Sequence, residues 1–157
     1  MPDLDGLPVS EKELELLRQL TNAEVPFMLV GLGAAVVQGA DAVTKNLDLW
    51  FRSTAHPGVA EAARRVGAVF AWRNNPPLFS GPGLDDIDIV IKCDGLRDFD
   101  AEYAAAIDIA LAPGLIVKVL PIDRVLASKR AADRPKDRAV IPALEAAIAA
   151  IKESSGR

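Results

Sequence analysis

Polar residues interrupt two strand-like segments of this chain. Asn46 and Asp48 alternate with apolar residues between positions 44 and 51, and Asp88 does so between positions 84 and 91. Successive side chains of a strand point to opposite faces, so Asn46 and Asp48 share one face. Carboxylate oxygens bind Mg²⁺, and an unpaired carboxylate within an apolar strand is costly. We therefore expect the three residues to converge on one cleft as candidate metal ligands.

A glycine turn precedes these segments. The apolar run 27–30 predicts a buried strand, Gly31 and Gly33 follow it, and residues 34–38 predict a short helix. The N–H groups at a helix start can receive phosphate, whereas glycine also serves where a strand and a helix pack closely. Both interpretations stay open. Such a turn together with carboxylates on two strands would suit metal-assisted phosphoryl or nucleotidyl transfer.

A basic segment lies near the C-terminus. Such a cluster is usually a solvated face of a helix and loop. As a surface charge, Lys129 is expected to contribute little to stability. The segment contains Lys129, Arg130, Arg134, Lys136 and Arg138.

Other polar residues have simpler explanations. Asp86 lies two residues before Asp88 on the same strand face and is the alternative ligand. Thr44 is β-branched, which suits a strand. His56 belongs to a turn, and Cys93 is interpreted as a small strand residue, so neither is assigned catalysis.

Four motifs follow one another along the chain. Together they resemble the minimal nucleotidyltransferases, particularly their AbiEii-type branch, over about residues 25 to 150. The motifs are Val30-Gly31-Leu32-Gly33-Ala34 with Gln38-Gly39, then Thr44-Lys45-Asn46-Leu47-Asp48-Leu49, then Ile87-Asp88-Ile89-Val90-Ile91, and finally residues 119–130 with Arg134-Pro135-Lys136-Asp137.

The resemblance implies transfer of a nucleoside monophosphate from a nucleoside triphosphate to an acceptor hydroxyl with Mg²⁺. The acceptor is RNA, protein or a small molecule, and relatives in this branch include toxins paired with antitoxins, so an antitoxin partner is implied. The roles carried over are catalytic for Asp48, Asp88, Lys129 and Asp137, metal-binding for Asn46, Asp48 and Asp88, and nucleotide-binding for Gly31, Gly33, Thr44, Lys129, Arg134 and Lys136.

Three positions depart from the family pattern. Asn46 stands where the family has its first aspartate, Leu32 replaces the second glycine, and Ala42 replaces an arginine. An asparagine offers a metal only a neutral carbonyl oxygen, so metal affinity is expected to fall. The alternative, which stays open, is that Asn46 simply forms hydrogen bonds with the backbone. The alternative function is therefore a catalytically impaired nucleotide-binding or interaction module, again within a toxin–antitoxin system.

The elements that position these residues predict an α/β (α+β) fold of the nucleotidyltransferase kind, with a small mixed sheet flanked by helices. Residues 1–24 are expected to hold an N-terminal helix packed on the core, and residues 25–157 to form the nucleotidyltransferase-like domain. The capping pair Ser10 and Glu13 starts the first helix at residue 11.

Periodicity predicts the remaining elements. Residues 107–119 are either a hairpin or a helix end followed by a strand, and residues 74–83 are expected to form a loop. Pro142 is expected in the first turn of the last helix. The expected helices cover 57–66, 99–106, 122–132 and 140–152, and the other strands 68–72 and 116–120.

Composition limits the possible classes of protein. The chain has 157 residues, half of them apolar, with a single Cys93 and a net charge of −4. One cysteine excludes cysteine-ligated zinc and iron–sulfur sites, and the acidic balance disfavours general electrostatic binding of DNA. The apolar runs are shorter than a membrane span and the N-terminus lacks a basic leader, so we expect a cytoplasmic protein without membrane partners.

Overall fold

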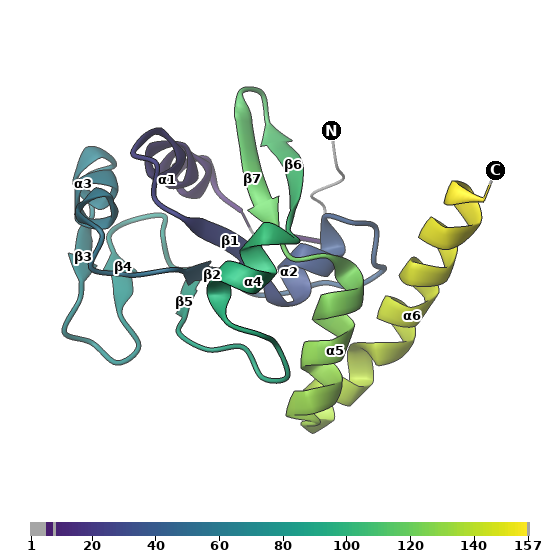
Figure 1. Ribbon diagram of the computed structural model, residues 1–157. Helices are drawn as coiled ribbons and strands as arrows, with labels where there is room; N and C mark the ends of the chain where they lie inside the picture. The colour runs from purple at the N-terminus through teal and green to yellow at the C-terminus, as the bar shows by residue number, and fades with distance from the viewer. Residues whose placement is uncertain (1–5, 8, 157) are drawn as a thin grey trace.

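The computed structural model describes residues 6–7 and 9–156 and has a mixed α/β architecture (Figure 1). Its centre is a mixed sheet of five strands in the order β5-β2-β1-β7-β6. Strand β2 is antiparallel to β1 and parallel to β5, β1 is parallel to β7, and β6 and β7 form an antiparallel hairpin. The strands are β1 (Phe27–Val30), β2 (Leu47–Phe51), β5 (Ile87–Val90), β6 (Ile107–Ala112) and β7 (Leu115–Val119).

Helices flank this sheet, and a separate hairpin of β3 (Val69–Ala71) and β4 (Leu78–Ser80) lies at one end of the molecule, near α3. Helices α5 and α6 pack together at the opposite end (Figure 1). Among the described residues, no helix is both long and apolar enough to cross a membrane. The helices are α1 (Glu11–Asn22), α2 (Gly31–Val36), α3 (Pro57–Arg65), α4 (Phe99–Ala104), α5 (Ile122–Ala132) and α6 (Pro135–Ser155).

Helix α1 begins with the predicted capping box. The Glu13 N–H donates to the Ser10 hydroxyl at 3.1 Å, and the Ser10 N–H donates to Glu13 Oε1 at 2.8 Å. Glu13 is buried, and its second oxygen accepts the Asp86 N–H at 3.1 Å. The cap therefore also fastens the chain that enters β5, just before the carboxylate of Asp88.

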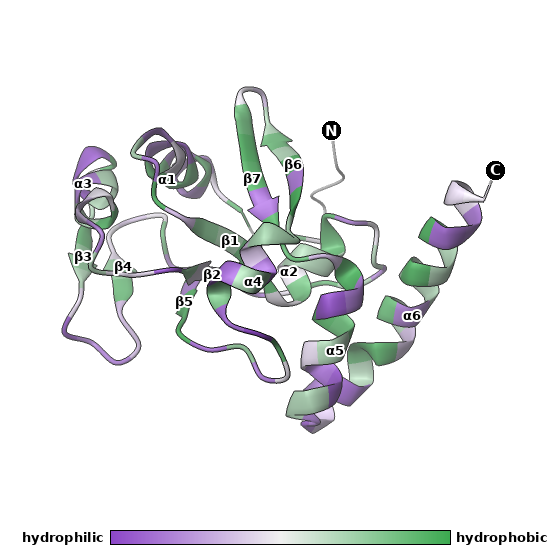
Figure 2. Cartoon of the chain, viewed as in Figure 1, coloured by the Kyte–Doolittle hydropathy of each residue, from purple (hydrophilic) through white to green (hydrophobic). Residues whose placement is uncertain are grey.

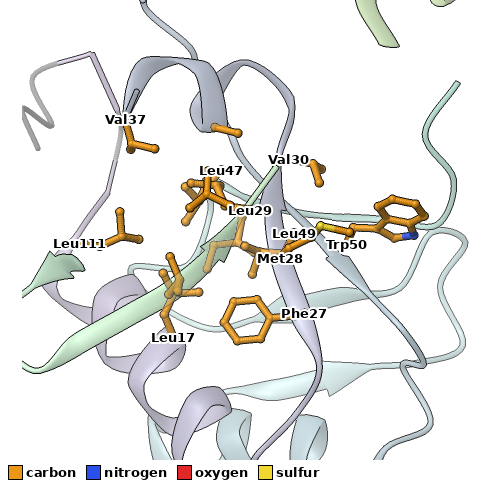
Figure 3. Packing of buried hydrophobic residues seen from close by; sticks show 14 of the residues in the cluster. Leu17, Phe27, Met28, Leu29, Val30, Val37, Leu47, Leu49, Trp50 and Leu111 are labelled. Atoms are coloured by element: carbon orange, nitrogen blue, oxygen red, sulfur yellow. The ribbon is translucent and has the colours of Figure 1, made fainter. Parts of the chain in front are cut away.

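The core contains apolar side chains from the sheet and from α1, including Leu17, Met28, Leu49 and Leu111 (Figure 3). Strand β1 is buried along its whole length because it lies in the middle of the sheet. Figure 2 shows hydrophobic colouring on β1 and hydrophilic colouring on the outward parts of α1. Burial on both faces explains why residues 27–30 are uniformly apolar rather than alternating.

Gln38 joins α2 to the start of α5. Its side-chain amide donates to the carbonyl oxygens of Ala34 and Leu120, both at 2.8 Å, and its Oε1 accepts the Ile122 N–H at 3.0 Å. Three of its hydrogen-bonding groups are thus used at this junction. The interaction places α5, which carries Lys129, beside the segment that follows β1.

Most elements lie where the sequence predicts them, but several boundaries differ. Strand β2 begins at Leu47 rather than at residue 44, and helix α2 begins at Gly31 rather than after the glycine turn. The expected loop 74–83 contains β4, which pairs with β3. That strand was missed because only three residues, 78–80, form it, between a proline pair and a glycine.

In the C-terminal half, the structure decides between the two alternatives for residues 107–119 and corrects the predicted start of the last helix. Residues 107–119 form the β6–β7 hairpin, turning at Pro113 and Gly114. Helix α6 begins at Pro135 instead of residue 140, so Pro142 lies inside it. Pro135 takes the first helical position, where proline loses no intrahelical hydrogen bond.

Candidate functional site

Asp48 and Asp88 lie side by side on neighbouring parallel strands. They are direct partners in the register of β2 and β5, so their side chains share one face of the sheet. Both also line one cleft of about 550 Å³. The prediction that these two carboxylates converge is confirmed. We call this space the edge cleft, and it is lined by Asp48, Asp88, Ile87, Asn74, Asn75 and Leu78.

Asp48 is the electrostatically costly member of the pair. Burial raises its pKa to about 6, and the nearby Asp88 charge adds to the increase, whereas Lys129 and Lys136 oppose it. Among the described residues, burial and charges cause this shift, and hydrogen bonds are not among its causes. The pair therefore concentrates negative charge that a cation would stabilise.

Gly31 packs directly against the Asp48 carboxylate. It has a φ of +66°, and a Cβ atom at this position would collide with Asp48 Oδ2. Both the left-handed backbone and the lack of space require glycine. Gly31 therefore brings the chain after β1 into contact with the acidic pair.

A second cleft, of about 210 Å³, shares Asp48 and Val90 with the edge cleft and is lined by basic side chains from separate segments. Lys129 comes from α5, Arg134 precedes α6, and Lys92 follows β5. These positive side chains lie near the negative carboxylate of Asp48. The arrangement would suit an anion bound by the basic side chains next to a cation bound by the carboxylate. We call this space the basic cleft, and its lining includes Gly31, Asp48, Lys92, Cys93, Lys129 and Arg134.

Asp137 is a buried residue that forms ion pairs with two of these basic side chains. Its side chain is fully buried and contacts Arg134 at 2.6 Å and Lys129 at 3.4 Å. Burial by itself would raise its pKa, but hydrogen bonds from Arg134 and the charge of Lys129 lower the pKa overall. Asp137 thus stays ionised and orients the basic groups, while its own oxygens are occupied by them.

Lys129→Ala is expected to lower the free energy of unfolding by about 1–2 kcal/mol, because buried Asp137 would lose one of its two cationic partners. The sequence-based premise that Lys129 is a surface charge is wrong: its side chain is only 19% exposed and ion-paired. Urea denaturation checks this. The exposed Lys136→Ala should stay within about 0.5 kcal/mol of the parent, and equal midpoints for parent and Lys129→Ala would contradict the prediction.

Asn46 and Thr44 lie in the turn before β2. Asn46 is exposed, and its N–H donates to the Thr44 hydroxyl at 3.3 Å, while that hydroxyl donates to the Asn46 carbonyl oxygen at 3.1 Å. The predicted strand position of Asn46 beside Asp48 is therefore wrong, because these local hydrogen bonds replace strand pairing. Thr44 shapes the turn through the same bonds.

Packing and backbone hydrogen bonds account for the positions of Gly33 and Asp86. Gly33 is buried, and a Cβ there would lie 3.1 Å from Leu7 and 3.6 Å from Leu29, so close packing accounts for it. Asp86 precedes β5, and its backbone bonds to Glu13 and Leu47. Asp88, rather than Asp86, is thus the strand partner of Asp48.

Sequence reasoning missed Lys92 and the asparagine pair Asn74 and Asn75. Lys92 lies four residues after Asp88, and a lysine so close to a carboxylate-bearing strand was the available signal. The asparagines lie on the β3–β4 connection, whose return to β5 no local pattern indicates. Cys93 lines the basic cleft, and burial together with Asp48 raises its pKa to about 12, which makes it a poor nucleophile.

Asp48 and Asp88 form a two-carboxylate arrangement. Among the described residues, no group of three or more His, Cys, Asp or Glu side chains is placed to hold a metal ion. Two carboxylates nevertheless fit Mg²⁺, which proteins commonly bind through one or two carboxylates together with substrate phosphates. The site is thus an acidic pair in the edge cleft, one member of which, Asp48, also lines the basic cleft.

Comparison with known proteins adds no assignment: no family model matches the chain, and no curated protein matches it.

Proposed function

We propose that this protein is a nucleotidyltransferase that transfers a nucleoside monophosphate from a nucleoside triphosphate to an acceptor hydroxyl. The observation that carries the proposal is the position of Asp48, which pairs with Asp88 and lines both clefts. Asp48 thus belongs both to a basic cleft suited to phosphates and to an edge cleft, which also holds Asp88 and is open to a second substrate. The resemblance of the ordered sequence motifs supports the same activity and the corresponding fold.

Asp48 and Asp88 would hold Mg²⁺. When bound, Mg²⁺ supplies charge neutralisation at the transferred phosphoryl group and a template for its orientation. The raised pKa of Asp48 is the cost of placing carboxylates together without protein partners, and a bound cation removes that cost. We therefore propose that the enzyme uses Mg²⁺, held by Asp48 and Asp88.

The basic cleft would bind the triphosphate. Lys129 and Arg134 are held by Asp137 at fixed positions, so they lose little side-chain freedom when phosphate binds. Lys92 supplies a third positive charge to the same cleft. These residues would orient the triphosphate so that an acceptor hydroxyl attacks the α-phosphorus and pyrophosphate leaves.

Transfer of label tests the proposal. The parent protein, Mg²⁺ and each of the four α-labelled triphosphates are incubated with cell RNA and with protein extract. We expect one acceptor to be labelled, and Asp88→Asn to reduce labelling at least about a hundredfold. Asp85→Asn, an exposed neighbour in the preceding turn, is the matched control. Absence of triphosphate binding in calorimetry together with absence of labelling would refute the function.

Asn46 favours a second candidate function, a nucleotide-binding or interaction module without turnover. It is exposed in a turn and offers no charge next to the acidic pair. Such a module would use the basic cleft to bind nucleotide but would not transfer it.

Asn46→Asp separates the two functions. From its turn before β2, a carboxylate at position 46 would add negative charge near the acidic pair without joining its strand face, so Asn46→Asp is expected to raise Mg²⁺ affinity about threefold and to increase label transfer by an impaired enzyme. Calorimetric titration with Mg²⁺ and the labelling assay measure the two effects. Asp41→Asn, exposed in the same connection, serves as a control for changed net charge. Nucleotide binding without labelling, by both the parent and Asn46→Asp, would favour the module.

A further inference from the structure

Strand β5 forms one margin of the central sheet. It pairs with β2 on one side, and among the described residues no strand pairs with its other side. The Leu47 N–H donates to the Asp86 carbonyl oxygen at 2.6 Å, which sets the pattern of this parallel pair. Because alternate residues turn their backbone groups to opposite sides of a strand, those of Ile87 and Ile89 face outwards. They present two N–H and two C=O groups to the edge cleft.

The outer edge of β5 faces an open cleft, although the strand has only four residues and carries one charged residue, Asp88. Natural edge strands are often kept short, carry charged residues or proline, or are covered by a helix or loop. The sequence of β5 is Ile-Asp-Ile-Val, and the segment 74–78 lies across an open cleft of about 550 Å³ from it. Apolar side chains line the space, among them Leu78, which is 38% exposed.

We propose that an extended polypeptide segment bearing a serine, threonine or tyrosine hydroxyl binds along this edge as an additional strand and is the acceptor of the nucleotide. This inference rests on the proposed nucleotidyl transfer. A polypeptide backbone is the ligand that matches N–H and C=O groups repeating every second residue. Neighbouring strands lie about 4.8 Å apart, so the residue opposite Asp88 would share the face of Asp48 and Asp88.

The charge of the edge-cleft lining favours a polypeptide acceptor over a nucleic acid. Binding of a polynucleotide depends on lysine and arginine contacts to phosphates. The described lining of the edge cleft holds two carboxylates, asparagines, prolines and apolar residues, but no basic side chain. The chain also carries a net charge of −4. An acceptor backbone without charge needs no basic side chain in this cleft, whereas a phosphate backbone would find none among its described lining.

The transfer step balances without a further reactant. The acceptor hydroxyl oxygen forms a bond to the α-phosphorus, and the bond from that phosphorus to the bridging oxygen of the β-phosphate breaks. Pyrophosphate leaves with the electron pair, and the hydroxyl proton passes to water. The product is a phosphodiester between the nucleoside and the acceptor side chain.

A defined peptide tests the strand addition. The probe is a soluble ten-residue peptide of alternating threonine and valine with one central serine and lysine at both ends. Its matched control carries N-methyl groups on alternate residues and cannot donate the same hydrogen bonds. In titrations followed by ¹⁵N NMR, we expect the amides of Ile87 and Ile89 to shift with the first peptide, and at least tenfold weaker binding of the second. Equal binding of both peptides would overturn the proposal.

Variants of Ile91 provide the matching test on the protein. Ile91 follows β5 directly and its side chain is exposed, so substitution leaves the core intact. Ile91→Pro removes an N–H group at the end of the edge and is expected to weaken peptide binding about tenfold. Ile91→Ala should bind like the parent, and triphosphate binding should be the same in all three proteins. Unchanged peptide binding by Ile91→Pro would count against the edge site.

The labelling assay separates this inference from the proposed function. Label from an α-labelled triphosphate on the peptide serine supports both. Label on a 3′-hydroxyl RNA oligonucleotide but not on the peptide overturns the polypeptide acceptor and leaves the transferase in place. No label on either, with no triphosphate binding, overturns the proposed function itself.

Discussion

Asp48→Asn is expected to reduce nucleotide transfer at least about a hundredfold and, in the absence of metal, to stabilise the fold at neutral pH. The carboxylate of Asp48 is half-buried beside Asp88, and its pKa is about 6. An amide of the same shape carries no charge to desolvate or repel. Loss of function with gain of stability is typical of a residue kept for a ligand.

The gain in stability expected for Asp48→Asn should increase as the pH rises. The unfolded carboxyl has a pKa of about 3.9, so between about pH 4 and pH 6 the unfolded state releases its proton first. The parent therefore loses stability as the pH rises through this window, by at most about 3 kcal/mol at 1.36 kcal/mol per pKa unit. Asp48→Asn should match the parent at pH 3 and exceed it by about 1–3 kcal/mol above pH 6.

Urea denaturation in a chelating buffer from pH 3 to pH 8 measures the effect. Asp85→Asn, exposed in the turn before β5, should follow the parent throughout. Added Mg²⁺ should stabilise the parent and not Asp48→Asn, by about 2.7 kcal/mol at a hundred times the dissociation constant. A variant less stable than the parent at pH 7.5 without metal would mean that the carboxylate has a stabilising partner within the protein.

Glu102→Ala is expected to lower the free energy of unfolding by about 3–5 kcal/mol. The Glu102 side chain is fully buried and contacts Arg124 at 2.7 Å and Arg97 at 3.0 Å. It also accepts the Arg97 N–H at 3.0 Å. Removing the carboxylate would leave two guanidinium groups and an N–H group without their shared acceptor, and would detach α4 from α5.

The pH dependence of Glu102 runs opposite to that of Asp48. Hydrogen bonds from Arg124 and Arg97 lower its pKa to about 2 despite its burial. Its stabilisation is complete above the unfolded pKa of about 4.3 and is lost as the pH falls towards 2. Glu102→Gln should therefore show a smaller loss of stability between pH 5 and pH 2 than the parent.

Thermal and urea denaturation of Glu102→Ala, Glu102→Gln and Glu145→Ala check this prediction. Glu145 forms an ion pair with Arg130 in which both side chains are more than half exposed, so its removal should cost less than about 1 kcal/mol. Similar denaturation midpoints for the Glu102 and Glu145 variants would show that burial does not determine how much these ion pairs contribute to stability.

The boundaries of several elements were predictable because local patterns determine them. The capping box at Ser10 and Glu13 starts α1 where expected, and the buried run 27–30 forms β1. Alternation around Asp48 and Asp88 indicated two strands with both carboxylates on one face. In each case the relevant interactions lie within a few residues of sequence.

Other features depended on contacts that local patterns do not encode. Residues 44–46 leave the predicted strand because Thr44 and Asn46 bond to each other, and 78–80 becomes a strand only through pairing with β3. The basic segment reads as a solvated surface until Asp137 is found buried beneath Lys129 and Arg134. Burial of a charge depends on which distant segments cover it.

The sequence by itself determined a mixed α/β fold, the strands that carry Asp48 and Asp88, and the residue types suited to a divalent cation. Only the tertiary structure decided that these carboxylates are register partners, that Lys92, Lys129 and Arg134 share a cleft with Gly31, and that no described strand pairs with the outer side of β5. The physical reason is the range of the forces involved. Hydrophobic periodicity and capping act along the chain, whereas strand order, desolvation and charge pairing depend on segments that meet only after folding.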